Sequence, residues 1–424
     1  MNHRIKISAP VFPKFVDSVP TRSPRPTVHG PWRPRGTPAK MMLQTQSAGA
    51  PAQRRAKGAA SVYAYRFGVN YTPSQNWWYC WNDFDADSIA RDLDAIAGLE
   101  ADHIRIMALW TFFQPNPAWV SPAHLERLEK LMSLADERNL DVCVSMLNGH
   151  LTGQNFRQGY EKNHSFFAAP EMRAAQKLYF KQVAGVVKAH ENFLGFDLGN
   201  ELNCCWNTAD LREGDAWFKD MIAYAEALAP NRVHVNGVDH APWFAKDTFS
   251  PAELAALQKI VALHCWIYFT GALERGGALD PPAVHLIDAM AALARAYAGT
   301  AGKPVWAQEY GASEQWMPRK TIPVFLERTM RNAIHGGVTW FSCWASHDIQ
   351  PKFKVNPLEY TLGLITCGQK IKPQGEVFRS LAREFRGTRL TPEALAAIPS
   401  MKPPETRNRN STWKWLLRWI DRAT

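Results

Sequence analysis

Two glutamates each come just after a short apolar run that is suited to a buried strand. Glu201 follows the run 194–198, and Glu309 follows the run 305–308. If the ends of both runs meet at one rim, a protonated carboxyl can give a proton to a departing oxygen while an ionised one attacks carbon, as retaining cleavage of a glycosidic bond requires. Either glutamate alone is weak evidence, because an acidic residue after a strand is more often a solvated loop residue or a helix cap.

Other polar residues fall near the same predicted strand ends. Arg105 lies in the apolar run 103–107, where it needs a carboxylate partner. Pairing with Glu309 would keep that carboxylate ionised, and the alternative is a structural salt bridge to another acid. Hydrogen bonds to sugar hydroxyls are the expected role of the remaining polar candidates, with ordinary packing as the alternative for the histidines: Asn200, His150 and His264.

Tryptophan indicates the class of substrate. Indole faces stack on the apolar faces of sugar rings, while polar groups bind the hydroxyls around the edge. Core packing is the alternative, and it is expected for Trp306 and Trp340. Nine of the 17 tryptophans fall at or just after predicted strand ends: Trp77, Trp78, Trp81, Trp110, Trp206, Trp243, Trp266, Trp316 and Trp344.

The elements that would position these residues are alternating strands and helices. Apolar runs predict eight strands, at 65–70, 103–108, 141–146, 194–198, 232–236, 260–264, 305–308 and 337–343. Amphipathic runs predict helices between them, including 88–99, 124–138, 172–190, 212–229, 283–298 and 321–335. This pattern predicts one (β/α)₈ barrel over residues 61–386. An open doubly wound sheet is the alternative, but the segment 68–71 lacks the glycine-rich phosphate loop that it would need.

Composition excludes several classes of protein. The chain has 424 residues, 46% of them hydrophobic and 21% charged, as in folded globular proteins. Because no apolar run is long enough for a membrane span and the N-terminus lacks the apolar core of a signal peptide, we expect a cytoplasmic protein. Seven cysteines without a CxxC pair indicate reduced thiols. Without HExxH, GxSxG or zinc-ligand spacing, we expect no metal and no cofactor.

The charge of the chain is concentrated at its beginning. Residues 1–60 carry eleven Lys or Arg, one Asp and nine prolines, whereas the rest carries 38 basic and 38 acidic residues. We therefore expect a disordered basic leader, or untranslated sequence before a start at Met41 or Met42, and no nucleic-acid partner. The end of the chain, 387–424, is expected to be an extension whose basic aromatic segment 413–420 packs on the barrel, stays loose or touches a membrane surface.

These residues resemble glycoside hydrolase family 5, within the clan of retaining (β/α)₈ glycosidases. Asn200-Glu201 matches the clan's Asn-Glu after strand four, which implies Glu201 as acid/base, and Glu309 matches its nucleophile after strand seven. Arg105 matches the arginine of strand two, and Trp344 matches the tryptophan that ends strand eight. The resemblance covers residues 65 to 385 and implies the fold and a retaining mechanism.

A longer set of motifs resembles the bacterial β-mannosidases of this family that cleave β-mannosyl-1,4-N-acetylglucosamine, the core disaccharide of N-glycans. It includes 67–74, 109–110, 114–116, 149–151, 346–348, 358–360 and 362–364. The resemblance thereby adds Asn70, Trp110, His347 and Asp348 as substrate-binding candidates. One departure stands out: the clan's His-x-Tyr after strand six is His264-Cys265-Trp266 here, so that either Trp266 or Tyr268 would support the nucleophile.

The sequence and the resemblance together predict an exo-β-mannosidase that acts on short β-mannosides, with an oligosaccharide as its partner. An endo-β-mannanase or β-glucanase is one alternative. A sugar-binding barrel without activity is the other, and it predicts that Glu201 or Glu309 points away from the mouth. The sequence does not indicate an oligomeric state.

Overall fold

Eight parallel strands form the centre of the protein in a computed structural model that describes residues 61–162, 164–206, 208 and 210–424. The expected leader, 1–60, lies outside the described residues. The strands are β1 (Arg66–Asn70), β2 (His103–Met107), β3 (Asp141–Ser145), β6 (Phe193–Asn200), β7 (Val235–Gly237), β8 (Val261–His264), β9 (Val305–Glu309) and β10 (Trp340–Cys343).

The strand order is that of a barrel. It runs β7-β6-β3-β2-β1-β10-β9-β8, and its two ends, β7 and β8, contact each other. The predicted (β/α)₈ barrel and its eight strands are thereby confirmed. The fifth strand begins later than predicted, because its pairing with β6 starts at Asp197 opposite Val235.

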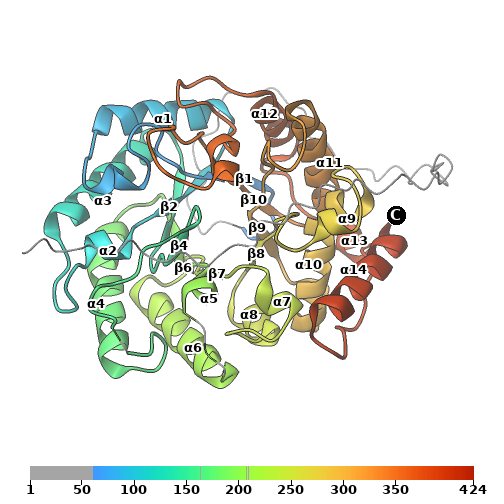
Figure 1. Ribbon diagram of the computed structural model, residues 1–424, viewed down its shortest axis with the longest axis horizontal. Helices are drawn as coiled ribbons and strands as arrows, with labels where there is room; N and C mark the ends of the chain where they lie inside the picture. The colour runs from blue at the N-terminus through green and yellow to red at the C-terminus, as the bar shows by residue number, and fades with distance from the viewer. Residues whose placement is uncertain (1–60, 163, 207, 209) are drawn as a thin grey trace, which may run out of the picture. The chain divides into compact units, whose positions relative to one another are not determined.

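One helix follows each strand and covers the outside of the barrel (Figure 1). The eight are α1 (Ala86–Gly98), α3 (Pro122–Asp136), α4 (Pro170–Val187), α6 (Leu211–Leu228), α8 (Pro251–Leu257), α10 (Leu286–Ala298), α11 (Ile322–His335) and α12 (Pro373–Phe385). Local sequence fixes where they begin: Asp85 accepts hydrogen bonds from two backbone N–H groups of α1, and α3, α4, α8, α11 and α12 have proline in the first turn.

The interior of the barrel has two layers. An apolar cluster fills the end at which the strands begin, and it includes Trp306 and Trp340 with ring centroids 5.3 Å apart, the two core tryptophans that the sequence predicts. Buried polar side chains fill the other end, at the carboxyl ends of the strands. Because loops that follow the strands also gather there, this end positions the site.

Further short elements belong to the described fold, and all but the last of them, which follows α12, lie in these loops. They are the 3₁₀ turns η1 (Trp77–Trp81), η2 (Ala272–Glu274), η3 (Arg319–Thr321) and η4 (Pro357–Thr361), the strands β4 (His150–Leu151) and β5 (Gln154–Asn155), and the helices α2 (Trp110–Phe113), α5 (Leu202–Cys205), α7 (Ala241–Phe244), α9 (Pro281–Val284) and α13 (Pro392–Ala396).

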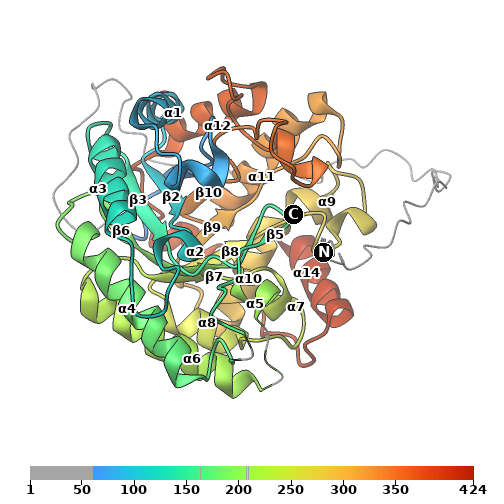
Figure 2. The ribbon, with the colours of Figure 1, turned by 60° about the vertical axis from the view of Figure 1, so that its left-hand side comes forward.

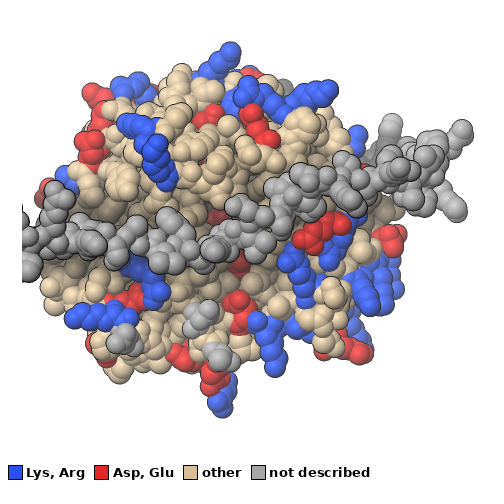
Figure 3. Space-filling view, in the orientation of Figure 1, with Lys and Arg blue, Asp and Glu red and all other residues tan. Residues whose placement is uncertain are grey.

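The C-terminal helix α14 (Arg409–Ala423) packs against α7, α9 and α10, beside the barrel (Figure 2). Its buried tryptophans donate hydrogen bonds to backbone oxygens: Trp413 to Thr270 at 2.8 Å and Trp419 to Pro399 at 2.7 Å. Of the three alternatives for this segment, packing on the barrel is therefore the one observed. No described helix is long and apolar enough to span a bilayer, and both signs of charge are interspersed over the face in Figure 3.

Candidate active site

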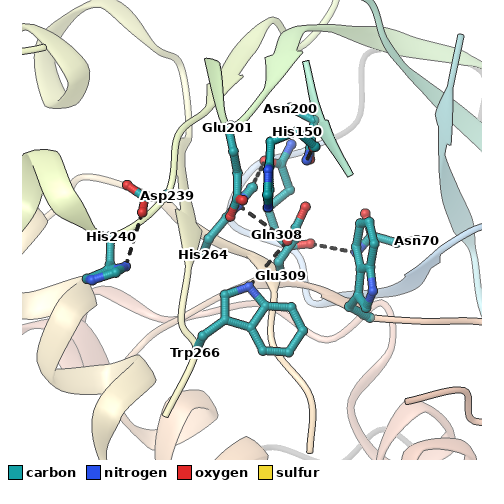
Figure 4. Close-up of polar contacts among 12 residues, drawn as sticks. Asn70, His150, Asn200, Glu201, Asp239, His240, His264, Trp266, Gln308 and Glu309 are labelled. Carbon is teal, nitrogen blue, oxygen red and sulfur yellow. Dashed lines mark hydrogen bonds and ion pairs between the residues drawn. The ribbon is translucent and has the colours of Figure 1, made fainter. Parts of the chain in front are cut away.

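Glu201 and Glu309 come together at the mouth of the barrel, from the ends of β6 and β9 (Figure 4). His264, the last residue of β8, lies between them. Its Nδ1 is 2.8 Å from Oε1 of Glu201 and 3.3 Å from Oε2 of Glu309. An oxygen of one carboxylate lies within 4.8 Å of an oxygen of the other. The two glutamates thus face the same space. The alternative of an inactive sugar-binding barrel predicts that one of them points away from the mouth, and neither does.

The backbone holds Glu201 in an unusual conformation. Its φ of 47° and ψ of 49° are left-handed, a region that residues other than glycine, asparagine and aspartate seldom occupy. The Glu201 N–H donates to the carbonyl of Gly237 in β7 at 2.7 Å, and helix α5 begins at the next residue. The hydrogen bond and the start of α5 hold the backbone of Glu201 in this strained conformation, and its carboxylate lies at the mouth.

Arg105, in β2, is fully buried and bonds to two carboxylates. Its Nη1 donates to Oε1 of Glu309 at 2.7 Å, and its Nε and Nη2 donate to Oδ2 of Asp197 at 3.0 and 2.6 Å. The predicted pairing with Glu309 and the alternative of a second acidic partner therefore both occur. Arg105 leaves only Oε2 of Glu309 turned toward His264.

Two asparagines complete the surroundings of Arg105. Asn70 accepts from Nη1 at 2.9 Å and donates to the backbone oxygens of Gln308 and Ser342, whereas Asn200 accepts from Nη2 at 2.7 Å. Asn200 also donates to the carbonyl of His150 at 2.7 Å. The structure thus gives both amides a role in fixing the guanidinium, and the predicted contact of Asn200 with a sugar hydroxyl stays a prediction.

His150 takes part through its backbone and through one ring nitrogen. It lies in β4, its Nδ1 is paired with Oδ1 of Asn155 at 2.9 Å, and its carbonyl binds Asn200. The β4–β5 hairpin is therefore joined directly to the side chains around Arg105.

The electrostatics of the three central groups are coupled. Burial raises the pKa of Glu309 above its ordinary value, although the His264 and Arg105 cations act in the opposite direction. Burial disfavours charge on His264, but the Glu309 and Glu201 carboxylates outweigh it and raise the pKa of the imidazole. The charge of Glu309 therefore depends on His264 as well as on Arg105, and Arg105 alone does not secure the ionised state that the sequence predicts.

Ligand atoms of Glu201, His264 and Glu309 lie within 4.8 Å of one another, so among the described residues this group could also hold a metal ion. No sequence spacing could reveal it, because the three residues come from three strands. His264 Nε2 faces Oε1 of Gln308 at 3.1 Å, which orients the ring for either use.

Trp266, and not Tyr268, contacts Glu309. The Trp266 Nε1 lies 3.4 Å from Oε2 of Glu309. Tyr268 is 53% exposed and stacks on Trp316, with ring centroids 5.6 Å apart and planes 2° apart. The structure thus distinguishes the two alternatives left by the departure from His-x-Tyr.

Trp344 follows β10, and its indole N–H binds the carboxyl group of Glu359. Its Nε1 donates to Oε2 of Glu359 at 3.3 Å. Burial raises the pKa of Glu359 to about 8, the hydrogen bond from Trp344 acts in the opposite direction, and Glu309 and Glu201 raise it further. We therefore expect Glu359 to be mostly protonated at pH 7, and the charges of Glu309 and Glu201 contribute to its raised pKa.

Three expected substrate ligands bond elsewhere. His347 pairs with Ser346 and Gln369, Asp348 pairs with Lys372 at 2.8 Å, and Trp110 is fully buried with its N–H bonded to Gln114. These contacts hold the loops that carry the three residues, and their predicted contact with a sugar stays a prediction.

The predicted set of sugar-facing tryptophans is also too large. Trp206, Trp266 and Trp344 keep 5–7% of their surface exposed, and Trp316 is half-buried. The rest are at most 2% exposed and pack on other side chains: Trp77, Trp78, Trp81, Trp110 and Trp243. The sequence position of a tryptophan after a strand does not show whether its side chain faces the mouth or lies beneath it.

Sequence reasoning missed Asp197, Gln308 and Glu359. Asp197 gave a usable signal, an acidic residue within the fully buried strand β6, where only a partner such as Arg105 could stabilise it. Gln308 gave a weaker signal as a polar residue next to Glu309. Glu359 belongs to the segment 358–360 that carries the resemblance, but its place 50 residues from Glu309, in η4, did not indicate that it lies near the two glutamates.

No protein-family model and no curated protein matches the chain. Among solved structures, it is similar to a GH5_18 variant from Streptomyces cattleya in complex with Manb1-4GlcNAc, with 32% identity, a TM-score of 0.75 and coverage of 78% of this chain and 83% of that one. A GH5_18 variant from Bifidobacterium longum subsp. longum, also in complex with Manb1-4GlcNAc, is 26% identical, with a TM-score of 0.75 and coverage of 84% and 89%. An exo-beta-1,4-mannosidase from an Opitutaceae bacterium is 22% identical, with a TM-score of 0.67 and coverage of 78% and 62%, and shares the fold.

Proposed function

The chain belongs to glycoside hydrolase family 5, and we propose that it is a retaining exo-β-mannosidase that cleaves short β-mannosides, with Manβ1-4GlcNAc as its substrate. The observation that carries the mechanism is the pair of carboxylates with oxygens within 4.8 Å. Retaining glycosidases separate their carboxyl groups by about 5–5.5 Å and inverting ones by about 6.5–9.5 Å. The relatives in complex with the disaccharide support the choice of substrate.

In this proposal, Glu309 is the nucleophile and Glu201 is the acid/base. Glu309 attacks the anomeric carbon through Oε2, since Arg105 binds Oε1. Glu201 gives its proton to the leaving oxygen, and the ionised Glu201 then takes a proton from the water that releases mannose. His264 touches both carboxylates, so it can stabilise whichever of them is charged at each stage.

The test is hydrolysis of Manβ1-4GlcNAc followed by NMR, with a panel of nitrophenyl glycosides to identify the sugar. We expect β-mannose as the first product, before it equilibrates with the α anomer, and the highest kcat/KM on the β-mannoside among the nitrophenyl substrates. Initial release of α-mannose would exclude the retaining mechanism, and turnover of β-glucosides alone would exclude the proposed sugar. Mannan serves as the substrate that an endo-acting enzyme would prefer.

A further inference from the structure

The position of Glu201 defines which way a substrate would lie, an inference that rests on the proposed function. Because the acid/base protonates the leaving oxygen, the leaving group lies beside β6 and the mannosyl ring extends away from it. In the strand order, β10 is four places from β6, which is the opposite side of an eight-stranded barrel. Trp344, just after β10, is therefore on the side toward which the far end of the mannosyl ring points.

Packed aromatic rings stand behind Trp344 on that side. The ring centroid of Trp78 is 6.1 Å from that of Trp344, Trp77 is 6.0 Å from Trp78, and Phe353 is 5.4 Å from Trp77. Trp77 and Trp78 belong to η1, after β1, and each is only 1% exposed. An open cleft would leave indole faces accessible for a second sugar, whereas these faces are covered by protein.

Hydrogen bonds join these rings to a third loop. Trp78 donates from Nε1 to Oγ1 of Thr152 at 3.0 Å, and Gln154 donates to the carbonyl of Lys354 at 2.8 Å. Phe156, which follows the β4–β5 hairpin, packs at 6.5 Å from Trp77. Since three separate loops are connected in this way, the rings form a fixed barrier and not a single movable side chain.

We propose that Trp77, Trp78, Phe156 and Phe353, the aromatic wall, close the site behind one mannosyl ring and thereby restrict the enzyme to removal of terminal residues. The wall determines exo action by excluding any sugar that is attached to the far end of that ring. It acts on substrate choice and leaves the chemistry at Glu201 and Glu309 unchanged.

The experiment compares the initial products from nitrophenyl β-mannoside and nitrophenyl β-1,4-mannobioside. The wild-type protein is expected to release mannose from the mannobioside and no mannobiose. Trp77→Ala and Phe353→Ala, which shorten the wall, are expected to release mannobiose at least tenfold above the background measured with the wild-type protein, with less than a fivefold change in kcat/KM on the mannoside. Trp419→Ala, a truncation of a buried tryptophan in α14, is the matched control and should leave the ratio unchanged.

The outcomes separate this proposal from the proposed function. If the wild-type protein cleaves the mannoside and also releases mannobiose, the wall does not confer exo action, although the function stands. If it cleaves neither substrate, the proposed function fails. Folded Phe353→Ala and Trp77→Ala proteins that still release only mannose would overturn the role of the wall. Phe353 is a partly exposed loop residue, so its variant decides the matter if the Trp77 variant does not fold.

Discussion

Two arginines pair with carboxylates at opposite ends of the barrel, and their surroundings differ in how far charge is balanced. Where the strands begin, Arg66 bonds to Asp102 at 2.8 Å and also pairs with Asp141. Although burial opposes the charge on Asp102, Arg66 and a hydrogen bond to His103 hold the pKa of Asp102 well below its usual range. At the mouth, Arg105 also bonds to two carboxylates, yet the pKa of Glu309 is raised.

Burial contributes most to the raised pKa of Glu309, and the number of acids that share each cation adds to the difference between the two ends. At the mouth, Glu201 and Glu359 add carboxyl groups near Glu309, and a single imidazole bridges Glu201 and Glu309. At the other end, the acids are matched by nearby donors. The comparison indicates that the end where the strands begin contributes stability. At the mouth, by contrast, the carboxyl groups can exchange protons during catalysis, as is usual for this fold.

The largest effect is expected from removing the proposed nucleophile. Glu309→Ala should lower kcat by at least about 10⁴-fold, as loss of a nucleophile does in covalent catalysis. Added azide should partly restore turnover of activated mannosides and give the α-mannosyl azide, detectable by NMR. A β-configured azide product would contradict the nucleophile role of Glu309.

Glu201→Gln should cost about 10²–10⁴-fold in kcat on Manβ1-4GlcNAc, because the departing sugar then leaves without a proton. The first step should suffer less on a nitrophenyl mannoside, whose leaving group needs little assistance, so burst kinetics can separate the two steps. Near wild-type turnover on the disaccharide would exclude this residue as the acid.

A substitution at the end of the barrel where the strands begin should change the free energy of unfolding and leave kcat nearly unchanged. Asp102→Asn weakens a partly buried ion pair and should lower the free energy of unfolding by about 2–3 kcal/mol, with kcat within twofold of wild type. Because the pKa of Asp102 is depressed in the folded state, its contribution is present above about pH 4 and is lost as the pH falls below that. Urea titrations at pH 7 and pH 3 measure both effects.

Asp197→Asn is the matched change at the mouth, since Asp197 is the fully buried partner of Arg105. It should lower both the unfolding free energy and kcat. If Asp102→Asn and Asp197→Asn reduced activity equally, the proposed division between the two ends would be wrong.

The smallest effect concerns Glu359, whose pKa of about 8 makes it neutral at pH 7. As the pH rises through 8, its ionisation places another negative charge near Glu309 and Glu201, and we expect kcat/KM to fall several-fold. Glu359→Gln keeps a neutral side chain that is nearly the same shape, so this decline should disappear. An unchanged alkaline limb in the variant would assign it to another group.

The barrel could be predicted from sequence because each buried strand is an apolar run and each helix has its own periodicity. The convergence of Glu201 and Glu309 followed from that topology. The sequence could not show that His264 contacts both glutamates or that Asp197 is the buried partner of Arg105, because these contacts depend on which strands become neighbours. The side-chain contacts of Trp110, His347 and Asp348 were not predictable either, because position after a strand does not reveal the direction in which a side chain points.

A short series of hydrogen bonds connects the C-terminal helix α14 to Glu309. Trp413 of α14 binds the carbonyl of Thr270, Thr270 binds the carbonyl of Trp266 at 2.8 Å, and Trp266 touches Glu309. Trp413 therefore braces a loop that borders the mouth. A substitution at Trp413 would be transmitted along this path, although this residue lies far along the sequence from either glutamate.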